Sequence, residues 1–102
     1  MIPQIHPRDA AQLLAGAIPP LLLDVREENE HTFASLPHSV LIPLGELHDR
    51  VGEIEDWKDK EVIVHCRSGV RSVTACMMLE QFGFSNTKNL TGGILAWEAL
   101  KA

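Results

Sequence analysis

Basic runs, long apolar runs and cysteine-rich stretches are all missing from this sequence of 102 residues. The nine Lys and Arg residues are scattered, and 14 Asp and Glu outnumber them, which gives a formal net charge of -5. Proteins that bind nucleic acid usually carry a basic stripe, so no nucleic-acid partner is expected. Trp57 and Trp97 are expected to pack rather than to stack on bases. An anionic substrate would have to be attracted by groups close to its site and not by the charge of the whole chain.

The apolar runs are too short to span a membrane. The longest, residues 17–23, is broken by Pro19 and Pro20, whereas a spanning helix needs about 20 apolar residues. The first residues lack the positive start and apolar core of a signal peptide. Only two cysteines are present, Cys66 and Cys76, too few for a secreted disulfide framework. We therefore expect no membrane partner, reduced thiols and a cytoplasmic location, with a monomer as the default.

Short apolar runs alternate with stretches of helical spacing along the chain. Strands are expected at residues 4–5, 21–25, 40–42, 62–64 and 87–90. Helices are expected at residues 7–15, 27–34, 44–54, 71–82 and 94–100. In the helix at 71–82, the side chains expected to face inward are Val73, Cys76, Met77 and Leu79. The alternation predicts one α/β domain over residues 1–102, with a mainly parallel sheet of about five strands flanked by helices. Ligands bind beyond the carboxyl ends of such strands, where the sequence places Asp24 and Cys66.

The segment around Cys66 combines features that favour a reactive thiolate. Cys66 follows a β-branched strand at once, a short loop with Gly69 comes next, and a helix begins at Arg71. Backbone N–H groups of a tight loop at a helix N-terminus converge into a positive nest, which stabilises a thiolate and lowers its pKa. Arg67 and Arg71 add positive charge, and Gly69 permits a positive φ. The sequence therefore predicts a nucleophilic Cys66, and the same nest would hold an anionic persulfide.

Several of these residues also have a plainer interpretation. In the alternative interpretation, Cys66 is a buried structural cysteine. Such cysteines seldom lie between two arginines in a strand–loop–helix turn. Cys76 would resolve a persulfide or form a regulatory disulfide, yet its mid-helix position favours a buried small residue. His65 would add positive charge beside Cys66 or simply pack, and packing is the expectation. The five histidines have no zinc-type spacing, so no metal site is expected.

Three blocks of the sequence resemble, in the same order, those of rhodanese-like domains. Residues 66–71, C-R-S-G-V-R, resemble the active loop of that family. Residues 24–30 resemble its early D-V-R-E-x-x-E segment, and residues 90–97 resemble its closing L-x-G-G-x-x-A-W segment. The blocks lie between residues 23 and 97, so the resemblance covers nearly the whole chain. It implies a three-layer rhodanese-like domain and a sulfurtransferase.

The resemblance also implies double displacement through a covalent persulfide. Cys66 would take the outer sulfur of a small anionic donor such as thiosulfate, and sulfite would leave. Cyanide, a thiol or a protein would then accept the sulfur, and no metal or organic cofactor is required. The substrate-binding loop would comprise Arg67, Ser68, Gly69, Val70 and Arg71. The supporting residues would be Asp24, Arg26 and Glu30.

The charged residues of this set have different expected roles. Arg67 is expected to contact the donor anion. Arg71 either does the same or braces the loop by pairing with Asp24 or Glu30, and bracing is favoured because a helix-opening side chain often points away from the loop centre. Asp24 and Glu30 would act as general acids or bases, or would form ion pairs with Arg26 or Arg71. The ion pairs are the expectation.

Other functions stay open at this point. Dual-specificity phosphatases and arsenate reductases also place a cysteine in an anion-binding loop, but five residues separate their Cys and Arg. Four separate Cys66 from Arg71, and the smaller nest suits a sulfur atom better than a tetrahedral phosphate. Some rhodanese-like domains are interaction modules, which typically lose the cysteine. A sulfur carrier with protein donors and acceptors shares the persulfide, and the sequence does not separate it from a thiosulfate enzyme.

One turn departs from the family pattern. Where the family commonly has G-H-I-P-G-A, this chain has A-S-L-P-H-S at residues 34–39. Ser35 takes the histidine position and His38 the second glycine position. The change puts the hydrogen bonding of that turn in doubt, and the chemistry less so.

Overall fold

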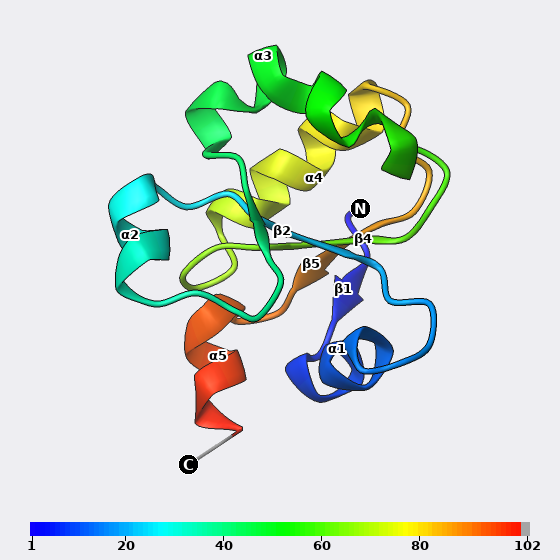
Figure 1. Cartoon of the computed structure of the whole chain (residues 1–102). Helices are drawn as coiled ribbons and strands as arrows, with labels where there is room; N and C mark the ends of the chain where they lie inside the picture. Colours follow the sequence, from blue (N-terminus) through cyan, green and yellow to red (C-terminus); the bar gives the residue numbers. More distant parts are fainter. Residues whose placement is uncertain (101–102) are drawn as a thin grey trace.

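A parallel sheet forms the centre of the computed structural model, which describes residues 1–100 (Figure 1). Its strands are β1 (Gln4–Ile5), β2 (Leu21–Asp24), β3 (Val40–Leu41), β4 (Val62–His65) and β5 (Thr87–Leu90). They lie in the order β1-β5-β4-β2-β3, and each pair of neighbours is parallel. The predicted α/β class and five-stranded parallel sheet are therefore confirmed.

Within residues 1–100, four α-helices and two 3-10 helices connect the strands, and a fifth α-helix follows the last strand. The α-helices are α1 (Pro7–Leu14), α2 (Glu28–Phe33), α3 (Leu47–Arg50), α4 (Arg71–Gln81) and α5 (Gly93–Ala99). The 3-10 helices η1 (Leu44–Glu46) and η2 (Val51–Trp57) flank α3. The helix expected at 44–54 is thus three short turns, because Gly45 and Gly52 weaken a continuous helix and Ile54 leaves helical geometry. No helix within residues 1–100 is long and apolar enough to cross a membrane.

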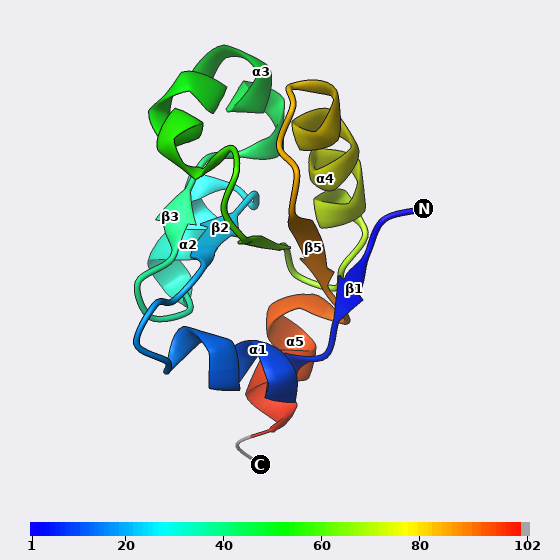
Figure 2. The same cartoon turned by 90° about the vertical axis from the view of Figure 1, so that its right-hand side faces the viewer.

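The helices cover both faces of the sheet and make the three layers that Figure 2 shows edge-on. α3 and α4 lie over one face, and α1 and α5 lie over the other. Side chains alternate along β4, so Val62 and Val64 join the apolar core beneath α4, while Ile63 joins the core beneath α1 and α5. Cys66 continues this alternation and belongs to the core on the α4 side.

The face that α4 buries agrees only in part with the expected one, and Val73 is only partly buried. Cys76 and Leu79 are fully buried as predicted, but Met77 is 53 % exposed and its predicted inward position is wrong. Ser72 and Ala75 are buried instead. With Cys76 and Leu79 they recur every three or four residues, the spacing that defines one helix face. The prediction placed only apolar residues on the inward face, so it did not recognise that the polar residue Ser72 belongs to that face.

The parallel register brings the predicted site together at one edge of the sheet. Asp24, the last residue of β2, pairs in register with His65, the last residue of β4. After Asp24 the chain continues into the segment before α2, and after His65 it continues into the Cys66 loop. α2 and the starts of α4 and α5 gather at this edge in Figure 1. This is the edge where parallel sheets bind ligands.

Candidate active site

The Cys66 sulfur lies inside a turn of backbone between β4 and α4. Its Sγ accepts hydrogen bonds from the Gly69 N–H at 3.1 Å and the Ser72 N–H at 3.4 Å. The Ser72 hydroxyl lies 3.3 Å away. Gly69 has a φ of 100°, a conformation that glycine adopts readily. Cys66 is 1 % exposed, so the loop encloses the sulfur almost completely.

The start of α5 holds the outer side of this loop. The Ile94 N–H donates to the Cys66 carbonyl at 3.0 Å, and the Leu95 N–H donates to the Arg67 carbonyl at 3.2 Å. These are amides of a helix's first turn, which have no partner within the helix. Gly93 is essential to the approach, because a Cβ there would lie 2.4 Å from the Arg67 carbonyl oxygen. The glycine pair of the closing motif therefore lets α5 bind the loop carbonyls, while loop amides face the sulfur.

Hydrogen bonding makes Cys66 a better thiolate than an ordinary cysteine. Burial raises the pKa of the Cys66 thiol, but the Ser72 hydroxyl and the backbone N–H groups of Ser72, Gly69 and Ser68 outweigh it. The net effect is a pKa below the usual value. Cys76 shows the opposite case, because burial and the nearby Glu80 carboxylate raise its pKa to about 12. The two cysteines of one chain thus differ in the property that controls thiol reactivity.

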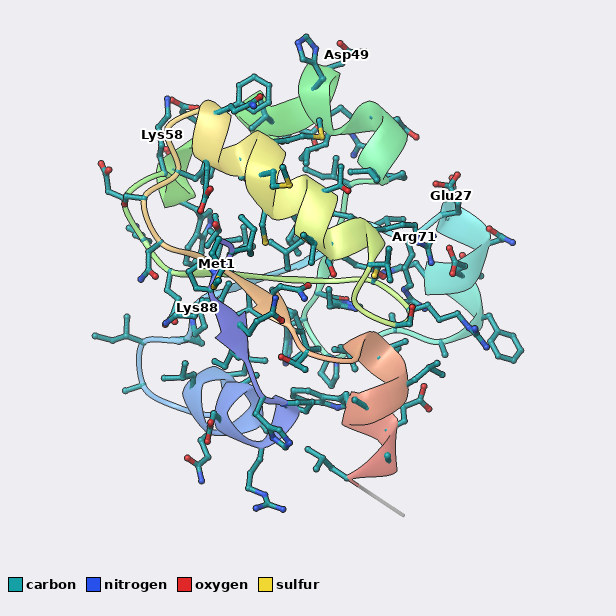
Figure 3. The ribbon with its side chains drawn as sticks, turned by 180° about the vertical axis from the view of Figure 1, so that it is seen from behind. Met1, Glu27, Asp49, Lys58, Arg71 and Lys88 are labelled. Atoms are coloured by element: carbon teal, nitrogen blue, oxygen red, sulfur yellow. The ribbon has the colours of Figure 1, made fainter. Side chains whose placement is uncertain are left out.

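Arg71 does not point at the sulfur but at α2. Its guanidinium donates to both carboxylate oxygens of Glu30, at 2.7 and 2.9 Å, and Figure 3 shows it reaching from α4 toward that helix. The hydrogen bond from Arg71 lowers the pKa of Glu30 to about 2. This two-point pair ties the start of α4 to α2, which is the bracing geometry expected from the sequence.

Asp24 and Arg26 form a second, fully buried pair behind the loop. The Arg26 side chain donates to both Asp24 oxygens, with Nη2 at 2.8 Å, and also to the Ala34 carbonyl. His31 Nδ1 lies 2.9 Å from the same carboxylate. Burial raises the pKa of Asp24, but Arg26, His65 and His31 together bring it below the usual value. The structure thus places Asp24 in the ion pair with Arg26 that the sequence favoured.

His65 packs, as expected, and adds no charge beside Cys66. It is fully buried, and burial lowers its pKa despite the nearby Asp24 carboxylate. Its Nδ1 lies 3.3 Å from the Cys66 carbonyl oxygen. Its Nε2 has no hydrogen-bond partner within the described chain. Burial thus favours the neutral form of the imidazole.

The remaining loop residues surround the opening. Arg67 and Ser68 are exposed, and Val70 is 74 % exposed at the tip. Arg67 has no ion-pair partner among residues 1–100, so it is the loop arginine that stays available to a ligand. Ser68 contributes its backbone N–H toward the thiolate. Within the described residues, no cluster of three or more His, Cys, Asp and Glu could hold a metal ion.

Sequence reasoning missed Ser72 and Asn89. The buried Ser72 hydroxyl donates a short hydrogen bond to the Asn89 Oδ1. The Asn89 amide in turn donates to the Gly69 carbonyl at 3.3 Å and to Gln4 Oε1 at 2.9 Å. Asn89 thus forms hydrogen bonds with both Gly69 and Ser72, the two residues whose N–H groups donate to the Cys66 sulfur. The available signal was a polar residue inside the buried strand β5, where Asn89 pairs in register with Val64 of the strand that leads to Cys66.

The atypical turn keeps a tight form in spite of its residues. His38 occupies the second glycine position with a φ of 63°, the left-handed region that costs energy for a residue with a Cβ. The Ser39 N–H and hydroxyl both donate to the Leu36 carbonyl, at 3.2 and 2.8 Å. The turn's hydrogen bonds are therefore made locally by Ser39.

The sequence and fold match one family throughout. The profile of the "Rhodanese-like domain" family matches residues 6–100. The chain belongs to the rhodanese-like domain family. It is 37 % identical over 97 residues to a sulfurtransferase of Allochromatium vinosum, covering 95 % of this chain and 89 % of that protein.

Members of this family also occur inside larger proteins. The chain is 31 % identical to part of the adenylyltransferase and sulfurtransferase MOCS3 of Arabidopsis thaliana, covering 94 % of this chain and 24 % of that protein. Among solved structures, it is 33 % identical to a rhodanese-related protein from Thermoplasma volcanium, with a TM-score of 0.85 over 96 % of this chain and 92 % of the other. The rhodanese-like fold expected from the three sequence blocks is confirmed.

Proposed function

We propose that this protein is a sulfurtransferase that carries sulfur as a persulfide on Cys66. The observation that carries the proposal is the pair of backbone N–H groups, from Gly69 and Ser72, that donate to the Cys66 sulfur. Such donors stabilise an anionic sulfur whether it is the thiolate or the outer sulfur of a persulfide. Sulfurtransferase relatives support the same assignment.

The first half-reaction loads the sulfur. The Cys66 thiolate attacks the outer sulfur of thiosulfate, the S–S bond of thiosulfate breaks, and sulfite leaves with the electron pair. Total charge is unchanged, so neither an oxidant nor a reductant is needed. Arg67 is the residue we propose to bind the donor anion, because Arg71 is already paired with Glu30. Ser68, Gly69 and Val70 shape the loop around the outer sulfur.

The second half-reaction unloads it onto a nucleophile such as cyanide or a thiol. Arg71 acts by holding the loop against α2, and Arg26 and Asp24 support the same edge from beneath. No resident metal or organic cofactor takes part. We also propose a cytoplasmic location, since this cycle needs a reduced Cys66, and Cys66 and Cys76 are both free thiols.

Steady-state kinetics test this cycle. Thiocyanate formation is measured while thiosulfate and cyanide are varied, with mercaptopyruvate and a cysteine desulfurase as further donors. Double displacement predicts parallel lines in double-reciprocal plots. Intersecting lines would contradict the covalent intermediate, and no turnover with any of the three donors would refute the activity.

A further inference from the structure

A cleft opens beside the Cys66 loop, lined by residues of α2 and of α5, two helices that lie at the same edge of the sheet in Figure 1. It has a volume of about 220 Å³, and the residues that line it include Phe33, Ala34, Arg67, Leu95 and Glu98. We call it the α2–α5 cleft. Because Arg67 directly follows Cys66 and lines this cleft, a molecule seated there lies next to the reactive loop.

Two apolar side chains on this cleft are left in water. Phe33, at the end of α2, is 93 % exposed, and Leu95, in the first turn of α5, is 47 % exposed. Val70, at the loop tip, is 74 % exposed. Exposed apolar groups gathered at a reactive site mark an interaction surface, and aromatic residues are frequent anchors in such surfaces. A small ion would use none of this apolar area.

The charges around the opening are mainly negative. Arg26 and Arg71 are neutralised by Asp24 and Glu30, so Arg67 stays as the cation. Three exposed carboxylates lie on the two helices that border the cleft or at their ends: Glu98 lines the cleft, and Glu27 and Glu28 lie at the start of α2. Figure 3 shows Glu27 on the same side of the molecule as Arg71. With a net charge of -5 over the whole chain, the surroundings attract a cationic protein partner, while Arg67 provides the local attraction for a small anionic donor.

The depth of the sulfur adds a constraint on shape. Cys66 is 1 % exposed, and a persulfide extends it by only about 2 Å, the length of one S–S bond. An acceptor thiol must therefore sit on a projecting segment that reaches into the loop while its neighbours rest on the cleft.

We propose that the α2–α5 cleft receives the sulfur acceptor, and that this acceptor is a protein whose cysteine lies on an exposed segment with an apolar side chain and Lys or Arg. The apolar side chain contacts Phe33 and Leu95, and the cation pairs with Glu98 or the carboxylates of α2. This inference rests on the proposed persulfide, whose acceptor it specifies.

The transfer step balances without a further reactant. The acceptor thiol passes its proton to the outer sulfur of the anionic Cys66 persulfide, and the resulting thiolate attacks that sulfur and forms a new S–S bond on the acceptor. The bond between the outer sulfur and Sγ breaks, and its electron pair returns to Sγ as the Cys66 thiolate. The proton on the outer sulfur moves with that sulfur to the acceptor persulfide.

Peptide thiols provide the test. The protein is loaded with thiosulfate, desalted, and checked by intact mass for one added sulfur atom. It is then mixed with short cysteine peptides of one length that carry beside the cysteine either Leu and Lys, Leu and Glu, Ser and Lys, or Ser and Glu. The rate at which the added mass disappears is recorded for each peptide. The Leu–Lys peptide is expected to discharge the persulfide about tenfold faster than the Ser–Glu peptide, the effect of one good contact.

Variants separate recognition from intrinsic thiol reactivity, because each variant is compared with the wild type using the same peptide. Phe33→Ser and Leu95→Ser are each expected to slow discharge by the Leu–Lys peptide about three- to tenfold and to leave discharge by the Ser–Lys peptide nearly unchanged. Glu98→Lys is expected to reduce the preference for Lys over Glu. Ile18→Ser is the matched control, since Ile18 is equally exposed at 93 % but lies away from the cleft.

The outcomes are distinct. If the mass gain occurs but all peptides discharge it in proportion to their thiolate content, or if Ile18→Ser acts like Phe33→Ser, the acceptor proposal is wrong and the sulfurtransferase proposal stands. If no mass gain occurs with any donor, both are wrong.

Discussion

Arg71 at the start of α4 and Glu30 on α2 form a two-point ion pair across 41 residues of sequence, with contacts of 2.7 and 2.9 Å. The pair joins the helix that carries the Cys66 loop to the helix that borders the α2–α5 cleft. It also removes Arg71 from the set of cations available to a ligand, so the two arginines of the C-R-S-G-V-R motif have different surroundings.

Acid should weaken this pair in a defined pH range. The pKa of Glu30 is lowered from 4.5 to about 2 in the folded protein, so its contribution to stability is present above about pH 4.5 and is lost as the pH falls toward 2. Glu30→Gln should lower the free energy of unfolding by up to about 1 kcal/mol at pH 6 and by much less at pH 2.5. Urea unfolding at the two pH values measures this. Glu53→Gln, which removes a pair with Arg50 whose carboxylate is more exposed than that of Glu30, is the control with little effect. An equal Glu30→Gln effect at both pH values would contradict the assignment.

Ser72 should control the reactivity of Cys66. Ser72→Ala removes the hydroxyl that lies 3.3 Å from the sulfur and donates to Asn89, so the loop N–H groups are held less firmly toward the sulfur and the pKa of the Cys66 thiol should rise. Alkylation by iodoacetamide at pH 7 should become about three- to tenfold slower, the effect of one lost hydrogen bond. Ser68→Ala is the control, because Ser68 contributes its backbone N–H and not its side chain. Equal rates for the two variants across the pH profile would show that the hydroxyl has no such role.

Gly93 should be nearly irreplaceable. A Cβ there would lie 2.4 Å from the Arg67 carbonyl oxygen, and the residue has a φ of 62°. Gly93→Ala should therefore destabilise the fold by about 2 kcal/mol or more and disturb the loop. Gly45→Ala, where nothing lies within 4 Å of the added Cβ, should be nearly neutral. Thermal unfolding of both variants gives the comparison, and a neutral Gly93→Ala would contradict the described contact between α5 and the loop.

His38 offers a gain in stability. Its φ of 63° suits glycine, so His38→Gly should raise the free energy of unfolding by about 0.5–1 kcal/mol, the relief of left-handed strain less the entropy that glycine adds to the unfolded chain. His48→Gly, inside α3, should instead lower it by about 1 kcal/mol. The sign of the two changes in chemical denaturation is the test, and a destabilising His38→Gly would show that the His38 side chain contributes to the turn.

The sheet, and the edge of it where Asp24 and Cys66 lie, could be predicted from the sequence because local patterns encode strands and loops. The β-branched run at Val62–His65 and the glycine at residue 69 report strand and loop directly. The partner of Arg71 was narrowed to Asp24 or Glu30 but not decided, since that choice depends on how α2 packs 41 residues away. Asn89 was missed for a similar reason: its contacts reach Gln4, Gly69 and Ser72, and only the register of β5 beside β4 brings them together. The roles of the loop residues in catalysis stay predictions.

Intact mass spectrometry after incubation with thiosulfate tests the central claim most directly, using the wild type, Cys66→Ser and Cys76→Ser. The account predicts a gain of one sulfur atom in the wild type and in Cys76→Ser, none in Cys66→Ser, and loss of the added mass when cyanide is supplied. Cys76 is fully buried with a pKa raised to about 12, so it should not compete. Sulfur retained by Cys66→Ser, or lost in Cys76→Ser, would contradict the assignment of Cys66 as the sulfur carrier.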